Sequence, residues 1–304
     1  MTSTHSGKRI IAVVGPTASG KTELAIRIAE FLKCEILSFD ARQFYAEMSI
    51  GTARPTTEQM RGIPHHFVGQ ISIHHPWSAG AFAEQADKFL ADHPEKHIVL
   101  VGGSGLYLSA LINGIHSFPP IPEELRLSLR RSFEEKGLDW LQQEVEHLDP
   151  TQFAFVDQKN PQRLLRILEV CIHSGKSYSS QLKKAELPRY QMLAVAPHIE
   201  RTALYERIDK RVELMMEKGL EEEAKELFSF RHLNALQTVG YSELFDHFKG
   251  EIDLKEAVQL IQRNTRRYAK RQLTWFRNQL PDTRWVDPHQ TDAIMPKLQS
   301  FIQP

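Results

Sequence analysis

Short apolar runs and longer stretches with helical spacing alternate along the chain. The apolar runs are rich in β-branched residues and predict five strands, at residues 10–14, 34–39, 97–101, 189–197 and 284–286. Between these runs, apolar residues recur at intervals of three and four, which is typical of helices packed on one face. Strands that alternate with helices predict an α/β fold with a parallel sheet.

Proline and glycine interrupt this pattern between Gly114 and Pro122, which indicates a domain boundary. Beyond it, the periodic segments are helical up to residue 189, and Asn160 and Pro161 have the N-cap and first-turn positions of one such helix. We therefore predict an inserted all-helical domain at residues 114–189, within a core formed by residues 8–113 and 190–304, the last of which includes C-terminal helices.

The first apolar run ends in a glycine-bounded loop, GPTASGKT, which a helical segment follows. Gly15 and Gly20 allow the backbone to form a concave nest whose N–H groups attract phosphate oxygens. Lys21 adds a positive charge, and the Thr22 hydroxyl can ligate Mg²⁺. The sequence thus predicts a P-loop NTPase-like core that binds a di- or triphosphate. The predicted phosphate-binding residues are Gly15, Pro16, Thr17, Ala18, Ser19, Gly20, Lys21 and Thr22.

Two further strand ends face this loop if the sheet is parallel. Asp40 follows the second strand, and ligands collect at the carboxyl ends of strands in open α/β sheets. The third strand ends at Gly102 and Gly103, where a P-loop ATPase would place an aspartate for magnesium. We expect the two glycines to let the backbone approach a ligand closely.

Composition narrows the class of protein. The 304 residues are 41% hydrophobic and 25% charged, as in ordinary globular proteins. No apolar run approaches the roughly 20 residues that span a bilayer, and residues 1–8 lack the apolar core of a secretory signal. We expect a cytoplasmic monomer without a membrane partner.

The histidine pairs at 65–66 and 74–75 have no carboxylate or cysteine at ligand spacing, which favours packing over metal binding.

The net charge is zero, but basic residues cluster locally. Residues 257–281 contain no Asp or Glu and carry Arg263, Arg266, Arg267, Lys270, Arg271 and Arg277. This helix can serve as a solvated face or supply partners for phosphates. Arg207 and Arg211 share another helical face, and their spacing alone does not separate a ligand role from a solvated one.

Seven segments resemble the bacterial tRNA dimethylallyltransferases, in the same order. They are GPTASGKT at 15–22, SFDARQFY at 38–45, IGTARPT at 50–56, PHH at 64–66, LVGGSGLYL at 100–108, NPQRLLRILEV at 160–170 and TRRYAKRQLTWFR at 265–277. The resemblance implies transfer of a dimethylallyl group from dimethylallyl diphosphate to N6 of adenosine-37, beside the anticodon of tRNA. Such a donor has no γ-phosphoryl group, which fits the missing strand-end aspartate.

The resemblance also implies site residues. Asp40 would be the general base, Lys21, Thr22 and Arg211 would assist departure of the diphosphate, and Thr22 and Asp40 would hold Mg²⁺. The segments that match tRNA contacts are Asp40, Ala41, Arg42, Gln43, Ser104, Arg126, Gln162, Arg163, Leu164, Leu165, Arg166, Gln237, Thr238, Val239, Gly240, Tyr241 and Ser242.

Two positions depart from the family pattern. The family usually has Ser at the position of Ala41 and Thr at that of Ser104, so a side-chain hydrogen bond from position 41 is in doubt. Two other functions are compatible with the loop. One is an ATP-dependent small-molecule kinase, and the other is a non-catalytic RNA-binding regulator that senses a nucleotide.

Overall fold

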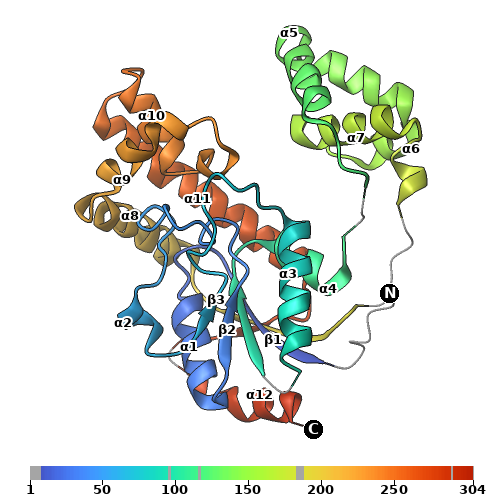
Figure 1. The fold of residues 1–304 in the computed structure, drawn as a ribbon. Coiled ribbons are helices and arrows are strands. Elements are labelled where there is room, and N and C mark those ends of the chain that lie inside the picture. The colour runs from blue at the N-terminus through green and yellow to red at the C-terminus, as the bar shows by residue number, and fades with distance from the viewer. Residues whose placement is uncertain (1–7, 95–96, 116–117, 183–187, 289, 304) are drawn as a thin grey trace. The chain divides into compact units, whose positions relative to one another are not determined.

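The computed structural model describes residues 8–94, 97–115, 118–182, 188–288 and 290–303. It divides into two compact units, which are coloured by chain position in Figure 1. The core unit comprises Met1–Gly114 and Pro188–Pro304, and the insertion unit comprises Ile115–Leu187. The sequence prediction for the first seven residues falls outside the described part of the chain.

A six-stranded sheet forms the centre of the described core unit, in the order β3-β2-β4-β1-β5-β6. All neighbouring strands are parallel, which confirms the predicted α/β class. The strands are β1 (Arg9–Val14), β2 (Glu35–Ser38), β3 (His65–His66), β4 (Ile98–Gly102), β5 (Gln191–Pro197) and β6 (Arg284–Val286). The sequence pattern missed β3, because two residues are too few to show any alternation.

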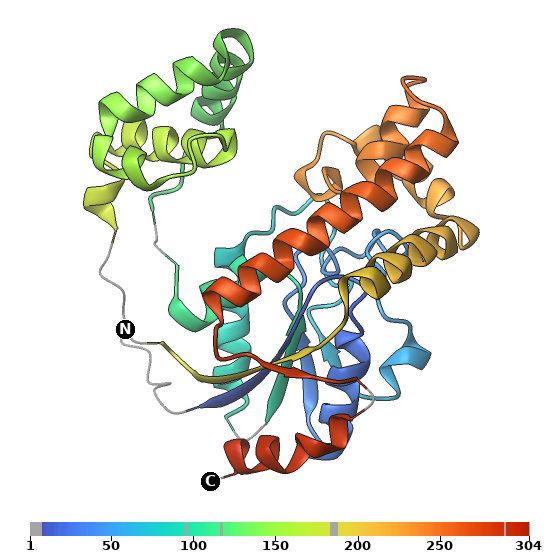
Figure 2. The ribbon, with the colours of Figure 1, turned by 180° about the vertical axis from the view of Figure 1, so that it is seen from behind.

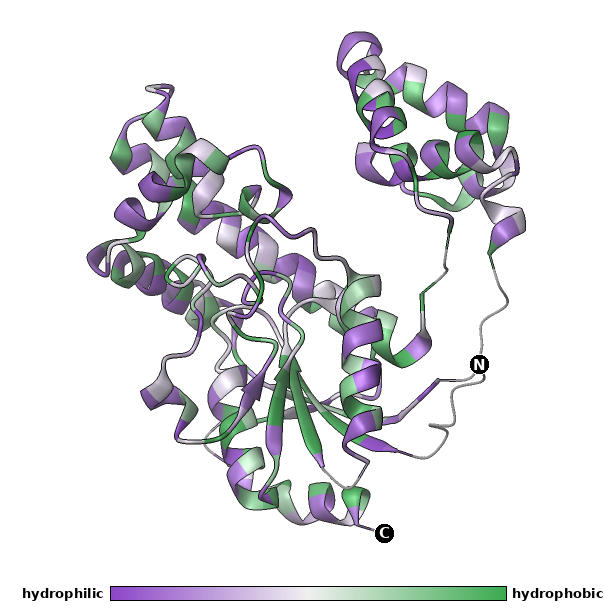
Figure 3. Ribbon diagram, in the orientation of Figure 1, coloured by the Kyte–Doolittle hydropathy of each residue, from purple (hydrophilic) through white to green (hydrophobic). Residues whose placement is uncertain are grey.

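Strand β1 separates two hydrophobic layers. Its residues Ile10, Ala12 and Val14 pack with helices α3 (Ala79–Asp92) and α4 (Gly105–Asn113). The intervening Ile11 and Val13 pack on the other face, with helices α1 (Lys21–Leu32) and α12 (Met295–Ile302). Because both faces of the sheet are covered, the strands are the strongly hydrophobic part of the core unit in Figure 3.

Four helices form a third hydrophobic cluster of the core unit with the loop after β2. They are α8 (Arg201–Glu217), α9 (Leu220–Leu227), α10 (Tyr241–Phe248) and α11 (Leu254–Gln279), and α8 and α11 run side by side in Figure 2. The remaining short helices of the core unit are α2 (Thr57–Met60) and 3-10 turns at Phe228–Phe230, Asn234–Leu236 and Thr291–Ala293. Among the described residues, no helix is both long and apolar enough to cross a bilayer.

The insertion unit is helical and has its own hydrophobic cluster. It contains α5 (Glu123–Leu148), α6 (Pro150–Phe155), α7 (Pro161–Ser174) and a 3-10 turn at Ser179–Gln181. Helix α5 is broken at Gly137, whose φ is 80°, a backbone conformation that glycine adopts readily. Asn160 caps α7 as predicted, because its side chain accepts a hydrogen bond from the Arg163 N–H.

Candidate active site

The predicted P-loop connects β1 to α1 and has the backbone of a phosphate nest. Gly15 has φ of 150°, Ala18 of 62° and Gly20 of 90°, so the loop turns back on itself before α1 begins. A Cβ at Gly15 would lie 2.9 Å from the Ser19 hydroxyl. Glycine is therefore needed at position 15 for close packing, and the free N–H groups at the start of α1 remain available to an anion.

Lys21 lies in a poorly hydrated position beside two other charged side chains. Desolvation lowers the pKa of its ammonium from 10.5 to about 8, which the Asp40 carboxylate partly opposes and the Arg211 guanidinium reinforces. The ammonium also donates a 3.3 Å hydrogen bond to the Pro16 carbonyl. A second anion placed here would stabilise the charged form of Lys21.

Thr17 joins the P-loop to two later helices. Its backbone N–H donates a 2.9 Å hydrogen bond to Gln272 Oε1 on α11, and its hydroxyl accepts one of 3.3 Å from Arg211 Nη1 on α8. Burial lowers the pKa of Arg211, but an arginine remains charged at neutral pH. The guanidinium predicted by resemblance therefore lies directly at the phosphate loop.

Asp40 lies two residues beyond β2, and the backbone holds its carboxylate. Its Oδ1 accepts hydrogen bonds from the N–H groups of Arg42, at 3.0 Å, and Gln43, at 3.4 Å. In the neighbouring residue, the Ala41 N–H donates a 2.8 Å hydrogen bond to the Ser104 hydroxyl. The orientation of Asp40 thus depends on backbone amides, while Oδ2 has no such partner among the described residues.

Thr17, Asp40, Arg211 and Gln272 line one cavity of about 340 Å³ within the core unit. These four residues form a polar and charged part of its wall. Another part is apolar. The apolar lining residues are Ala41, Gly51, Ala53, Val212, Met215, Leu220, Val239, Gly240 and Ile261, and the lining also includes Arg42, Thr52, Tyr107, Asn234, Thr238, Thr265 and Tyr268. A ligand with an anionic end and an apolar end fits this division.

The glycines at the end of β4, Gly102 and Gly103, allow close packing. A Cβ at Gly102 would meet the Phe39 ring at 2.6 Å, and one at Gly103 would meet the Gln272 side chain at 2.2 Å. The Gln272 amide donates a 2.9 Å hydrogen bond to the Gly103 carbonyl. We expected these glycines to let a ligand approach the backbone. In the structure, the space beside them is filled by Phe39 and Gln272, so the glycines make room for protein side chains.

Among the residues predicted to contact tRNA, Tyr241 and Leu164 have fully buried side chains. Tyr241 and Leu164 have no solvent-exposed surface, because each packs into the hydrophobic cluster of its unit. The tRNA contact of Tyr241 and Leu164 stays a prediction, and their side chains are enclosed by protein in this structure. In the same segments of the chain, Thr238, Val239 and Gly240 line the cavity, and Gln237, Gln162 and Arg163 are exposed.

Basic residues of the insertion unit surround one carboxylate. Arg166 and Arg126 lie 3.3 Å and 3.9 Å from Glu169 Oε2, and the Arg166 guanidinium also lies over the Phe118 ring. Arg126 Nη1 also lies 3.8 Å from Glu123 Oε2, so the two arginines and the two glutamates of this group balance in charge. The predicted contacts Arg126 and Arg166 therefore belong to one charged group, with Leu165 partly exposed beside it.

Arg207 is a candidate that sequence reasoning left undecided. Its Nη1 lies 3.9 Å from the position that a Cβ of Gly20 would occupy, so the side chain reaches the start of α1. Arg207 is exposed, one helical turn before Arg211. Both arginines of this face thus approach the P-loop, a fact that the four-residue spacing could suggest but not establish.

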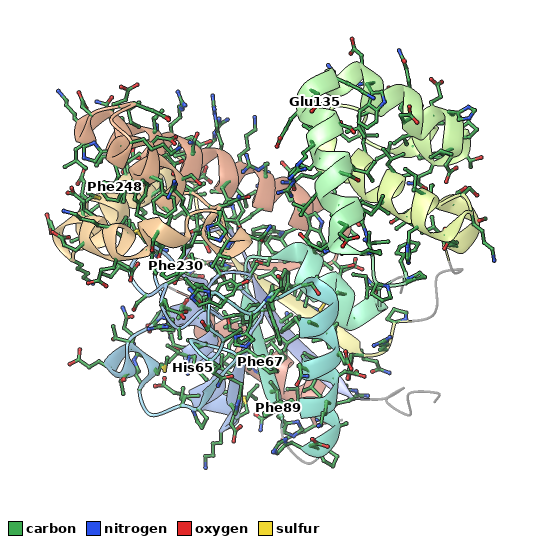
Figure 4. The ribbon with its side chains drawn as sticks, turned by 45° about the horizontal axis from the view of Figure 1, so that its top comes forward. His65, Phe67, Phe89, Glu135, Phe230 and Phe248 are labelled. Atoms are coloured by element: carbon green, nitrogen blue, oxygen red, sulfur yellow. The ribbon has the colours of Figure 1, made fainter. Side chains whose placement is uncertain are left out.

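Of the two histidine pairs, His65 and His66 pack as the sequence favoured, whereas His74 and His75 are exposed. His65 Nδ1 lies 2.8 Å from the Ile63 carbonyl, and His66 Nε2 lies 2.7 Å from a Glu35 oxygen. Phe67 and Phe89, both labelled with His65 in Figure 4, have ring centroids 6.3 Å apart. In the part of the chain that the structure describes, no three His, Cys, Asp or Glu side chains form a metal-binding group.

A parallel sheet with this loop at the carboxyl end of an inner strand defines a P-loop protein of the α/β class. The sequence model of the IPP transferase family matches residues 43–279. That match begins after Asp40, so it is independent of the P-loop itself. The chain belongs to the IPP transferase family.

Relatives extend the similarity over nearly the full chain. The tRNA dimethylallyltransferase of Christiangramia forsetii is 45% identical over 91% of this chain and 93% of its own length. The tRNA dimethylallyltransferase 1 of Bacteroides fragilis is 40% identical over 98% of this chain and 100% of its own.

Solved structures have the same fold. The tRNA isopentenylpyrophosphate transferase of Bacillus halodurans superposes with a TM-score of 0.72 and 32% identity, and covers 97% of both chains. A eukaryotic dimethylallyltransferase acting on tRNA superposes with a TM-score of 0.79 at 22% identity, over 96% of this chain and 79% of that one, and shows the fold alone.

Proposed function

We propose that this chain transfers the dimethylallyl group of dimethylallyl diphosphate to N6 of adenosine-37 in tRNA. The products are N6-(dimethylallyl)adenosine and diphosphate. The observation that carries the proposal is the single cavity in which the Asp40 carboxylate, the P-loop residue Thr17 and Arg211 meet an apolar wall. The names of the full-length relatives support the same reaction.

The reaction needs a base and a site for the leaving group. The N6 amine attacks the first carbon of the prenyl group, and the bond from that carbon to the diphosphate oxygen breaks. Asp40, through Oδ2, takes the proton that N6 loses. The departing diphosphate carries the electron pair of the broken bond, and the P-loop N–H groups, Lys21 and Arg211 stabilise its charge.

Magnesium fits the oxygen donors at this site. Thr22 offers a hydroxyl and Asp40 a carboxylate, and Mg²⁺ is usually held by one or two such protein groups together with substrate phosphates. We propose that these two residues hold Mg²⁺. When bound, the ion would neutralise charge on the diphosphate.

The acceptor tRNA would be held by both units of the chain. In the core unit, we propose contacts from Asp40, Ala41, Arg42, Gln43, Ser104, Gln237, Thr238, Val239, Gly240 and Ser242. In the insertion unit, we propose contacts from Arg126, Gln162, Arg163, Leu165 and Arg166. The exposed side chains of Arg126, Gln162 and Arg163 support phosphate binding there. The target base must leave its stack to reach the prenyl carbon.

A transfer assay tests the reaction. Purified protein, unmodified tRNA and labelled dimethylallyl diphosphate should give labelled tRNA without ATP, and AMP should be a poor acceptor. Asp40→Ala should abolish transfer, because it removes the base and a proposed Mg²⁺ ligand, and should leave tRNA binding largely intact, because the other proposed tRNA contacts remain. Asp246→Ala is a matched control, because this partly exposed carboxylate on α10 pairs with Lys249 at the surface and is not in the cavity lining. Persistent transfer by Asp40→Ala would remove Asp40 from the base role, and ATP-dependent phosphorylation of a small molecule would favour a kinase.

A further inference from the structure

A carboxylate remote from the P-loop holds one wall of the cavity. Glu223, on α9, accepts hydrogen bonds from three consecutive backbone N–H groups, those of Ser49, Ile50 and Gly51, at 2.9, 2.8 and 2.9 Å. The last of these residues and the next two line the cavity. A carboxylate with several N–H donors makes strong, directional hydrogen bonds, so Glu223 fixes the conformation of this loop.

Tyr241 connects the same carboxylate to a second part of the wall. Its hydroxyl donates a 2.6 Å hydrogen bond to Glu223 Oε1. Burial and the nearby Glu223 charge raise the pKa of that hydroxyl, so it remains a donor at every physiological pH. A Cβ at Gly51 would lie 2.6 Å from the Tyr241 ring, which means that the loop backbone rests directly on the aromatic face.

The backbone beside Tyr241 is itself fixed. The Gly240 N–H donates a 2.8 Å hydrogen bond to Glu243 Oε2, and Asn264 on α11 donates one of 2.7 Å to the other Glu243 oxygen. Gly240 lines the cavity together with Thr238. Tyr241 therefore joins two loops of the wall that are far apart in sequence.

The loop held by Glu223 in turn orients a polar side chain next to Asp40. Gln43 Nε2 donates hydrogen bonds to the Thr52 and Ala53 carbonyls, at 3.1 and 3.2 Å. A carbonyl only accepts, so these two partners assign the nitrogen and oxygen of the Gln43 amide. The Gln43 N–H also reaches Asp40 Oδ1, which connects the wall loop to the proposed base.

We propose that Glu223 and Tyr241 are a positioning pair that holds the acceptor side of the cavity, formed by residues 51–53 and 238–240, in its reactive geometry. Neither side chain lines the cavity. They act through the loops that they hold. This inference rests on the proposed tRNA prenyl transfer, since it concerns the acceptor in that reaction.

The test compares Glu223→Gln and Tyr241→Phe with Glu222→Gln, an exposed neighbour on the same helix. An amide nitrogen at position 223 would face N–H donors, and the Phe variant loses only the hydroxyl. We expect kcat/KM for tRNA to fall about tenfold or more in Glu223→Gln, and less in Tyr241→Phe, since small misplacements of reacting groups are costly. The double variant should lose no more than Glu223→Gln alone.

Two further measurements separate positioning from general damage. The dissociation constant for inorganic pyrophosphate should stay within about twofold of wild type, because the P-loop, Lys21 and Arg211 bind pyrophosphate and the two substitutions leave them unchanged. Amide hydrogen exchange of a peptide that covers residues 46–54 should rise in both variants and not in Glu222→Gln. Wild-type kinetics in Glu223→Gln, or losses of pyrophosphate binding and tRNA turnover in equal proportion, would overturn the proposal. If the wild type transfers no prenyl group, the proposed function fails, and the exchange result still decides whether the pair holds the loop.

Discussion

The Arg211 guanidinium donates a 3.3 Å hydrogen bond from Nη1 to the Thr17 hydroxyl, although 194 residues separate the two in sequence. This contact brings a charge from α8 to the phosphate loop after β1. The helix itself is positioned by its buried residues Leu204, Ile208 and Val212. The hydrogen bond therefore depends on how α8 is placed relative to the loop.

Arg211→Ala should lower kcat/KM for prenyl transfer by about 10²–10³. The guanidinium would stabilise charge that develops on the diphosphate as the carbon–oxygen bond breaks, so removal should affect the chemical step more than tRNA binding. Steady-state transfer and tRNA-binding assays measure the two effects. Arg211→Lys should restore only part of the rate, because an ammonium lacks the planar fork. A full restoration by Lys would show that charge alone matters.

Arg207→Ala should weaken binding of inorganic pyrophosphate by about 3- to 10-fold. Its guanidinium lies beside Gly20 but is exposed, and an exposed charge is screened by solvent. Isothermal titration calorimetry at low and high salt would measure the effect, which should shrink as salt rises. Arg201→Ala is the control, since that guanidinium lies over the Tyr205 ring at the start of α8. Equal affinities of the two variants would exclude Arg207 from the phosphate site.

Lys21 makes stability and binding depend on pH in a defined direction. Its pKa is lower in the folded protein, about 8, than the ordinary 10.5, so the charged form opposes folding. This penalty is fully present below pH 8 and disappears as the pH approaches 10.5. Lys21→Met should therefore be more stable than wild type at pH 7, by about 1–3 kcal/mol, and the difference should shrink at pH 9.5.

Urea unfolding at both pH values measures this difference, with the exposed Lys210→Met as the control. Pyrophosphate binding should also cause proton uptake near pH 8.5, because the anion favours the charged ammonium. Calorimetry in buffers of different ionisation enthalpy detects that uptake. A Lys21→Met variant that is less stable than wild type at pH 7 would contradict the conclusion that the buried charge of Lys21 opposes folding.

Gln272→Glu should destabilise the core unit by about 1–3 kcal/mol and weaken pyrophosphate binding. The substituted carboxylate has the same shape, but it would place an oxygen against the Gly103 carbonyl in place of the Nε2 donor. The Thr17 N–H bond would be disturbed with it. Urea unfolding and calorimetry measure the two effects against Gln279→Glu, which is exposed at the end of α11. Unchanged pyrophosphate affinity would separate Gln272 from the P-loop.

The strands other than β3 and the phosphate loop could be predicted from the sequence, because short segments of neighbouring residues carry their patterns. The run before Gly15 has the length of a buried strand, and the glycine spacing of the loop is specific. The two-residue β3 has no such signal. Tertiary packing determines features that the local pattern does not show. Gly102 and Gly103 make room for Phe39 and Gln272, and Tyr241 is buried in the hydrophobic cluster around α10.

Long-range hydrogen bonds were beyond prediction from the sequence. Glu223 is one of three consecutive glutamates at the start of α9, and nothing in that run distinguishes it from its neighbours. Only the folded chain brings it to the N–H groups of residues 49–51. The family resemblance identified Arg211 by its position in the chain, whereas the approach of Arg207 to the same loop follows from the geometry of α8.

The pairing of β1 with β5 has a consequence for synthesis on the ribosome. Strand β1 pairs with β4 on one side and with β5 on the other, and the whole insertion unit is translated between β4 and β5. Until residue 197 has emerged, the nascent chain carries β1 with one unpaired edge, and open edges invite aggregation. The insertion unit has its own hydrophobic cluster and can collapse during that interval. During translation, the insertion unit would therefore fold before β1 gains its second neighbouring strand, β5.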